Sequence, residues 1–192
     1  MKKSILVYAL FSSIALYAGE NMNVSLCNLG QLPGTVVAHA QEEASAVFRA
    51  IDVEIVWREC GEGPGSEEAA RAHWYTIRLR SDAPPRFAGS RSLDAMGFAY
   101  VTAQVPGNMA DAYYKAVEWV AGGNTSDAAA LLGCVMAHEL GHLLLGPGHV
   151  PNGIMRPAWK SQDVNAVRKR WLTFNAAQTA RIHATLQTTE PQ

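Results

Sequence analysis

The sequence contains little cysteine and little charge. Three cysteines among 192 residues are too few for a disulfide scaffold. The 16 Lys and Arg residues almost balance the 17 Asp and Glu residues, so the chain lacks the basic excess typical of nucleic-acid-binding proteins. Apolar residues make up 48 % of the chain, which is too many for a disordered protein. The length, with no repeat or long linker, fits one globular domain.

The N-terminus has the pattern of a secretory signal peptide. Lys2 and Lys3 precede an uncharged run that ends at Tyr17, and two small residues follow it. The run is shorter than the roughly 20 residues that a membrane-spanning helix needs. We therefore expect a signal peptide at 1–18 and a mature domain at 19–192. An uncleaved membrane anchor is the alternative interpretation.

Export predicts a secreted or periplasmic protein in an oxidising compartment. Cys27 and Cys60 could pair there, although the sequence alone leaves their bonding open. Cys134 is predicted to be a buried free thiol. For the mature protein we expect a monomer with no membrane contact and no nucleic-acid partner.

The pattern of apolar residues predicts the secondary structure. β-branched and aromatic runs between Gly- and Pro-containing loops indicate strands, and apolar residues three and four apart indicate helices. The predicted strands are Asn23–Leu29, Val53–Arg58, Trp74–Arg80, Gly97–Thr102 and Met109–Tyr114, the last two forming a hairpin or two successive strands. The predicted helices are Val37–Ile51, Ala128–Leu145 with its N-cap within 125–127, and Val164–Leu186. This order predicts an α+β fold with a mixed, twisted sheet of about five strands.

The predicted helix Ala128–Leu145 contains the sequence His138-Glu139-Leu140-Gly141-His142. Histidines four residues apart lie on one helix face, with Cβ atoms about 5–6 Å apart, so both imidazoles can bind one Zn²⁺. Glu139 lies about 100° further round the helix and can reach a water on the metal without binding the metal itself. Two partnered histidines on an ordinary helix are the alternative, but the apolar surroundings offer them no obvious partners.

A zinc ion needs a third protein ligand besides these two histidines. Downstream of His142 the candidates are His149, Asp163, His183 and Glu190. The turn Gly146-Pro147-Gly148 can send the chain back towards the helix, which makes His149 the favoured ligand.

These residues resemble the metzincins, a clan of zinc metallopeptidases. The resemblance rests on His138, Glu139, His142 and Gly146-x-x-His149, followed by Met155 in a Gly-Ile-Met-Arg-Pro stretch. The sequence has three residues between His142 and Gly146, where the clan pattern has two. One extra helical residue rotates the end of the helix by about 100°, which the Pro147-Gly148 turn has to compensate.

The resemblance implies a zincin-like fold with an early helix on the sheet, a long active-site helix and a C-terminal helix. It also implies one Zn²⁺ bound by His138, His142 and His149, and a secreted endopeptidase in which Glu139 is the general base for a zinc-bound water. Met155 would form an apolar floor below the histidines. A protein or peptide substrate would bind in extended form along a strand, and the implied substrate-binding residues are Gly97, Phe98, Ala99, Tyr100 and Trp159.

Two other functions fit the same motif. A zinc-binding module without peptidase activity would use the three histidines for stability or for binding a partner, with the fourth metal position closed. A metal-free helical packing domain would bind no zinc and would not respond to a chelator.

Overall fold

Five strands form one mixed sheet in the computed structural model, which describes residues 20–62, 73–84, 95–104 and 107–188. The strands lie in the order β2-β1-β3-β5-β4, and only β4 runs antiparallel to its neighbour. Their bounds are β1 Glu20–Asn28, β2 Val53–Glu59, β3 Trp74–Arg80, β4 Gly97–Ala99 and β5 Met109–Tyr113. The predicted α+β class and the predicted number of strands are confirmed. The predicted signal peptide lies outside the described residues.

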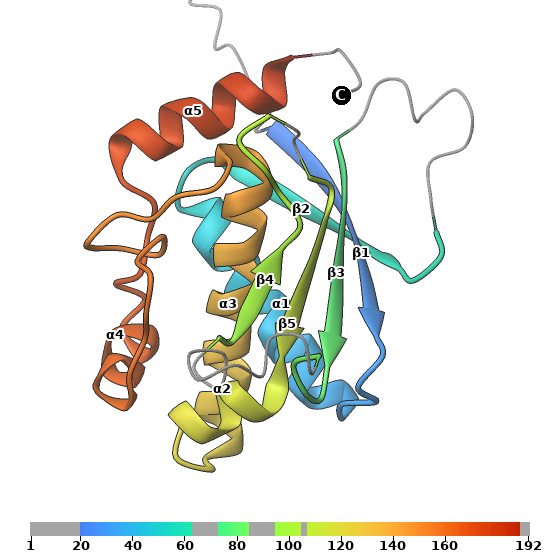
Figure 1. Cartoon of the computed structure of the whole chain (residues 1–192), viewed down its shortest axis with the longest axis vertical. Helices are drawn as coiled ribbons and strands as arrows, with labels where there is room; N and C mark the ends of the chain where they lie inside the picture. The colour runs from blue at the N-terminus through green and yellow to red at the C-terminus, as the bar shows by residue number, and fades with distance from the viewer. Residues whose placement is uncertain (1–19, 63–72, 85–94, 105–106, 189–192) are drawn as a thin grey trace, which may run out of the picture.

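Two long helices, α1 (Gly34–Arg49) and α3 (Thr125–Leu145), pack against each other and cover one face of the sheet (Figure 1). The connection from β1 through α1 to the parallel strand β2 is a β-α-β unit, which places α1 on the sheet. The other helices lie around α3. The helix bounds are α1 Gly34–Arg49, α2 Tyr114–Val120, α3 Thr125–Leu145, η2 Ser161–Asp163, α4 Val164–Arg168 and α5 Ala176–Gln187.

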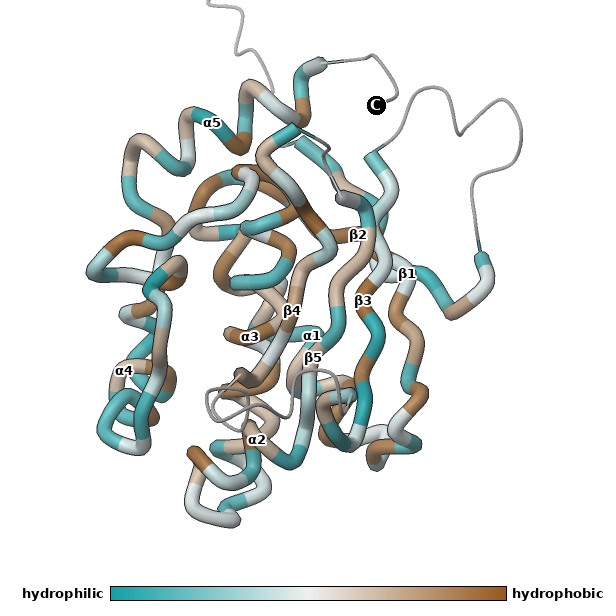
Figure 2. Tube along the Cα trace, viewed as in Figure 1, coloured by the Kyte–Doolittle hydropathy of each residue, from teal (hydrophilic) through white to brown (hydrophobic). Residues whose placement is uncertain are grey.

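The helix α3 is the centre of the core, and almost every one of its residues is buried. It is long and apolar enough to cross a membrane, but 89 % of its apolar stretch is buried inside this fold. Figure 2 shows the apolar residues concentrated along α3 and along the strands that it faces. Gly133 permits close packing of the two long helices, since a Cβ at this position would lie 2.4 Å from the Ala40 carbonyl oxygen of α1.

The C-terminal prediction of one helix over Val164–Leu186 is wrong. Helix α4 ends at Arg168, and α5 begins only at Ala176. Between them the chain leaves the helical path at Arg170, whose φ is +52°, and buries Leu172 and Phe174 in the core. The apolar residues that suggested a continuous helix are therefore core residues of an irregular segment.

A local capping signal starts each of the last two long helices. Asn175 and Gln178 form a capping box that begins α5, with both reciprocal hydrogen bonds at 2.9 Å. The N-cap of α3 is Asn124, whose side chain accepts from the Asp127 N–H at 3.0 Å, one residue before the predicted range. The short helix α2 was not predicted at all, and β4 ends three residues earlier than expected.

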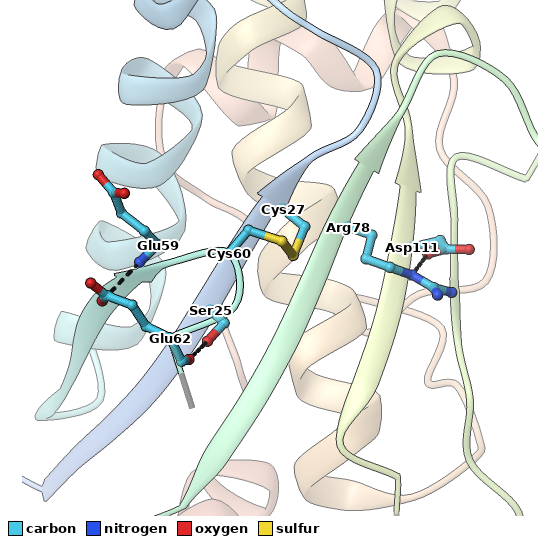
Figure 3. Close-up of a disulfide and its surroundings, with 7 residues drawn as sticks. All are labelled: Ser25, Cys27, Glu59, Cys60, Glu62, Arg78 and Asp111. Carbon is cyan, nitrogen blue, oxygen red and sulfur yellow. Dashed lines mark hydrogen bonds and ion pairs between the residues drawn. A yellow bond between two sulfur atoms is a disulfide. The ribbon is translucent and has the colours of Figure 1, made fainter. Parts of the chain in front are cut away.

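The sheet face turned away from α1 and α3 holds a disulfide (Figure 3). Cys27 on β1 is bonded to Cys60, which directly follows β2, across a sequence separation of 33 residues. The Ser25 hydroxyl on β1 donates to the Glu62 carbonyl at 2.7 Å, so a second contact joins the same two segments. Cys134 is free and buried, as predicted.

The same face buries a charged group beside the edge of the sheet. Asp111 on β5 is fully buried and accepts from the Arg78 guanidinium at 2.5 Å (Figure 3). Arg80 lies 3.2 Å from its other oxygen, which also accepts from the Tyr100 hydroxyl at 2.9 Å. These three partners compensate the charge of the buried carboxylate. The contact with Tyr100 also ties the chain that follows β4 to β5.

Candidate metal centre

The two histidines of the H-E-x-x-H motif lie on one face of α3. His138 is 9 % exposed and His142 is 7 % exposed, so both side chains are buried together with the helix that carries them. Gly141, between them in sequence, leaves room for Met155, because a Cβ there would lie 2.5 Å from the Met155 sulfur. The segment that contains Met155 therefore packs directly against the motif.

His149 reaches the same point from the loop after α3. The helix ends at Leu145, and Gly146 adopts a φ of +84°, which a residue with a Cβ rarely takes. Gly148 follows with a φ of +137°. These two conformations reverse the chain within three residues, so the extra residue before Gly146 does not keep His149 away from the motif.

The three imidazole rings converge through their Nε2 atoms. His142 Nε2 lies 3.0 Å from His138 Nε2 and 3.2 Å from His149 Nε2, and all three nitrogens fall within 4.8 Å of one another. Nitrogens bound to a tetrahedral zinc ion at about 2.0–2.1 Å lie about 3.3 Å apart. The spacing around His142 therefore matches a shared metal ion.

Backbone carbonyls fix the tautomers of the two helix histidines. The Nδ1–H of His138 donates to the Ile154 carbonyl at 2.7 Å, and that of His142 donates to the Gly146 carbonyl at 3.2 Å. Because a carbonyl only accepts, each Nδ1 carries the proton and each Nε2 presents a lone pair. Two lone pairs that face each other at 3.0 Å repel unless a cation lies between them, so these residues fit a bound metal.

The protonation of the histidines also suits a metal. Burial lowers the pKa of His138 to about 4, and it lowers the pKa values of His142 and His149 as well. All three rings are therefore neutral at neutral pH, which is the form that binds metal ions.

Glu139 lies beside the three histidines and against the edge strand. Its side chain is buried, it accepts a hydrogen bond from the Ala99 N–H, and it touches the Cα side of Gly97. Burial raises the pKa of Glu139 to about 8, although the hydrogen bond from Ala99 lowers it. The carboxylate form is favoured by any divalent cation held at the neighbouring histidines.

A cavity of about 360 Å³ opens over the histidines and Glu139. One wall is the edge strand, with Gly97, Phe98 and Ala99, and the opposite wall is the segment 156–159. Trp159 contributes its ring there and also meets the His138 ring edge-on at 5.8 Å. Four of the five predicted substrate-binding residues therefore line this cavity.

The fifth, Tyr100, does not line the cavity, because its hydroxyl is directed to Asp111 on the other face of the sheet. Met155 is 1 % exposed beneath the motif, and its carbonyl accepts from the Val150 N–H at 2.9 Å. The orienting carbonyls of Ile154 and Gly146 had no signal in the sequence, since every residue carries one.

The fold resembles those of solved metalloproteinases. No family model and no curated protein sequence matches this chain. Archaemetzincin from Methanopyrus kandleri is similar with a TM-score of 0.53 and 16 % identity, over 91 % of this chain and 99 % of that one. Metalloproteinase-II from Bacteroides fragilis is similar with a TM-score of 0.51 and 16 % identity, over 88 % of this chain and 54 % of that one.

This chain thus spans about half the length of the Bacteroides protein. At 16 % identity, these comparisons show a shared zincin-like fold. The expected α+β fold with a long central helix and a C-terminal helix is therefore confirmed.

Proposed function

We propose that this protein is an exported, zinc-dependent endopeptidase of the metzincin type. One observation supports this proposal most strongly: three histidine Nε2 atoms converge beside a buried glutamate, at the floor of a cavity bounded by a sheet edge. His138, His142 and His149 would hold one zinc ion. Met155 would be the methionine of the metzincin turn, since it packs against Gly141 between the two helix histidines.

The proposed chemistry is hydrolysis of a peptide bond by water. When bound, zinc supplies a Lewis acid that polarises the scissile carbonyl and acidifies water at its open position. Glu139 takes the proton from the attacking water and later gives it to the leaving amine. His138 and His142 stay neutral and oriented because their Nδ1 protons are held by backbone carbonyls.

The edge strand β4 is the proposed docking site for an extended substrate. Its inner side pairs with β5, where Phe98 lies opposite Asp111. Its other side has no strand partner within the described residues. The Ala99 N–H lies on that free side, where it donates to the Glu139 carboxylate, and the next N–H, from Tyr100, donates to Met109 of β5. A peptide can add a strand there and place its scissile bond over the histidines.

The further features of the proposal follow from the sequence. The signal peptide at 1–18 supports export to the periplasm or the medium, where the disulfide of Cys27 and Cys60 is stable. We propose a monomer that contacts neither a membrane after cleavage nor a nucleic acid.

A zinc-binding module without activity would need a fourth protein ligand or another use for Glu139. Within the described residues, the group of metal-ligating side chains contains the three histidines and no fourth member. Glu139 instead lies at the cavity, where a carboxylate can receive a proton from water. These two observations favour the enzyme.

Zinc content and peptide cleavage, measured on the same purified proteins, test the proposal. Glu139→Ala should keep one zinc ion per chain and lose about 10²- to 10⁴-fold in turnover, as for other general bases. His142→Ala should lose both zinc and turnover. Glu54→Ala, which removes an exposed glutamate on β2, is the matched control and should change neither. An active Glu139→Ala protein would show that the proposed mechanism is wrong.

A further inference from the structure

The segment 154–159 packs around His138, the first of the proposed metal ligands. The Ile154 carbonyl holds the His138 Nδ1 proton, and the Trp159 ring lies edge-on to the His138 ring. Arg156, between these two residues, lines the cavity together with His138. Arg156 therefore contributes to the wall of the proposed substrate cavity, with a side chain that is 21 % exposed.

Arg156 is the only Lys or Arg side chain among the described residues that line this cavity. The neighbouring wall residues Pro157, Ala158 and Trp159 are apolar. A cation beside apolar groups interacts more strongly with an anion than a solvated surface cation does.

A second residue holds Arg156 in place. Arg156 Nη2 makes an ion pair with Asp163 Oδ2, and this oxygen also accepts from the Lys160 N–H at 2.7 Å. The contact with Arg156 lowers the pKa of Asp163, so Asp163 is charged at neutral pH. Asp163 is not among the cavity residues, so the carboxylate that holds Arg156 does not itself line the cavity.

The guanidinium keeps unused hydrogen-bonding capacity. It carries five N–H donors, and the ion pair with Asp163 engages only Nη2. Arg156 Nε and Nη2 are both buried, so a group in the cavity reaches the guanidinium at Nη1. A carboxylate in the cavity can accept a charged hydrogen bond from this nitrogen, whose direction is fixed by the planar guanidinium fork.

We propose that Arg156 is a specificity-determining residue that selects peptides carrying a carboxylate close to the scissile bond. The proposal rests on the proposed peptidase function, for which it names the substrate class. The carboxylate belongs either to an acidic side chain or to the C-terminus of the peptide. Both sources present the same group to the guanidinium, and a matched set of peptides distinguishes them.

Binding to zinc-loaded Glu139→Ala protein tests this selection without turnover. The probes are hexapeptides that differ only by Glu against Gln at each position in turn, each with a free or an amidated C-terminus. Calorimetry should show about 10- to 100-fold tighter binding of one carboxylate-bearing probe than of its neutral partner, as expected for a charged hydrogen bond. A preference for Glu indicates a side chain, and a preference for the free acid indicates the C-terminus.

The control variants separate the charge of Arg156 from its structural role. Arg156→Gln with Asp163→Asn removes both charges, so no buried charge is left unpaired, and this double variant should bind both probes of each pair equally. Arg156→Lys should keep part of the preference, since lysine retains the charge but not the fork. Zinc content and thermal unfolding, measured on each variant, report whether the fold persists.

Each outcome bears on one proposal in particular. Equal binding of carboxylate and neutral probes, or no probe binding at millimolar concentration, overturns the role of Arg156. A preference that persists in the double variant also overturns it. If the protein with Glu139 intact cleaves no peptide but the Glu139→Ala protein still discriminates, the peptidase proposal fails and the carboxylate site stands.

Discussion

Replacing Gly97 by alanine should reduce catalysis while leaving zinc and the fold in place. A Cβ at this position would lie 2.4 Å from Glu139 Oε1, 2.7 Å from Cγ and 2.8 Å from Cδ. Real Cβ atoms do not approach other heavy atoms closer than 3.0 Å, so the carboxylate has to move by at least about 0.6 Å. The three nearest atoms all belong to Glu139, and its flexible side chain can move at a small cost in stability.

The magnitude follows from how strongly catalysis depends on position. A displacement of about 1 Å at a catalytic group lowers the rate by about 10²-fold, so we expect kcat to fall by about 10- to 100-fold. This range corresponds to about 1.4–2.7 kcal/mol of transition-state stabilisation. The metal ligands are not among the three nearest atoms, so the zinc content should stay at one ion per chain.

The assay is steady-state cleavage of a quenched peptide, with zinc quantified and thermal unfolding recorded on the same samples. Gly34→Ala is the matched control, since a Cβ at Gly34 meets nothing within 4 Å. If Gly97→Ala retains the wild-type kcat, the carboxylate does not act from the position seen beside β4. If Gly97→Ala loses zinc together with activity, the effect is on the fold, and the reasoning about Glu139 is also refuted.

Two further predictions concern stability. The metal-free protein should lose on the order of 3 kcal/mol of unfolding free energy as the pH falls from 6.5 to about 4. Burial lowers the pKa of His138 to about 4 in the folded protein. In this pH range the His138 side chain therefore gains a proton in the unfolded chain but not in the folded one. Denaturant titrations at pH 7 and pH 4.5 should show a smaller loss for His138→Gln, and an equal loss contradicts the prediction. Replacing both Cys27 and Cys60 by serine should lower the unfolding free energy by about 2–4 kcal/mol, since their bond closes a loop of about 33 residues. The zinc content of this variant should not change, and an unaltered denaturant midpoint refutes the stability estimate.

The sequence predicted the parts of the fold that depend on local patterns. The strand Trp74–Arg80 alternates between buried and partly exposed residues, and its predicted and observed bounds agree. The histidines of α3 had to share a face because helix geometry fixes residues four apart. The helix after Asp163 was mispredicted because Leu172 and Phe174 continue an apolar spacing while lying in an irregular segment.

Within the site, the sequence could not predict contacts made by the path of the chain. The return of His149 depends on the φ values of Gly146 and Gly148, and composition suggests such a turn without specifying its direction. The pairing of Arg156 with Asp163 depends on how the six intervening residues fold. Tyr100 was expected at the substrate site, but its hydroxyl donates to Asp111 of β5, and the sequence does not show which strands are neighbours.

The two acceptors that orient the helix histidines are main-chain carbonyls, at Ile154 and Gly146. A point mutation can replace any side chain, but it cannot delete a carbonyl. The orientation of both ligands is therefore tolerant of amino-acid exchange at the residues that supply the acceptors, provided that the loop keeps its path. Changes in loop length act differently, because one inserted or deleted residue between positions 146 and 154 shifts an acceptor away from its ring. Over evolutionary time, this centre should accept substitutions in that loop more readily than changes in its length.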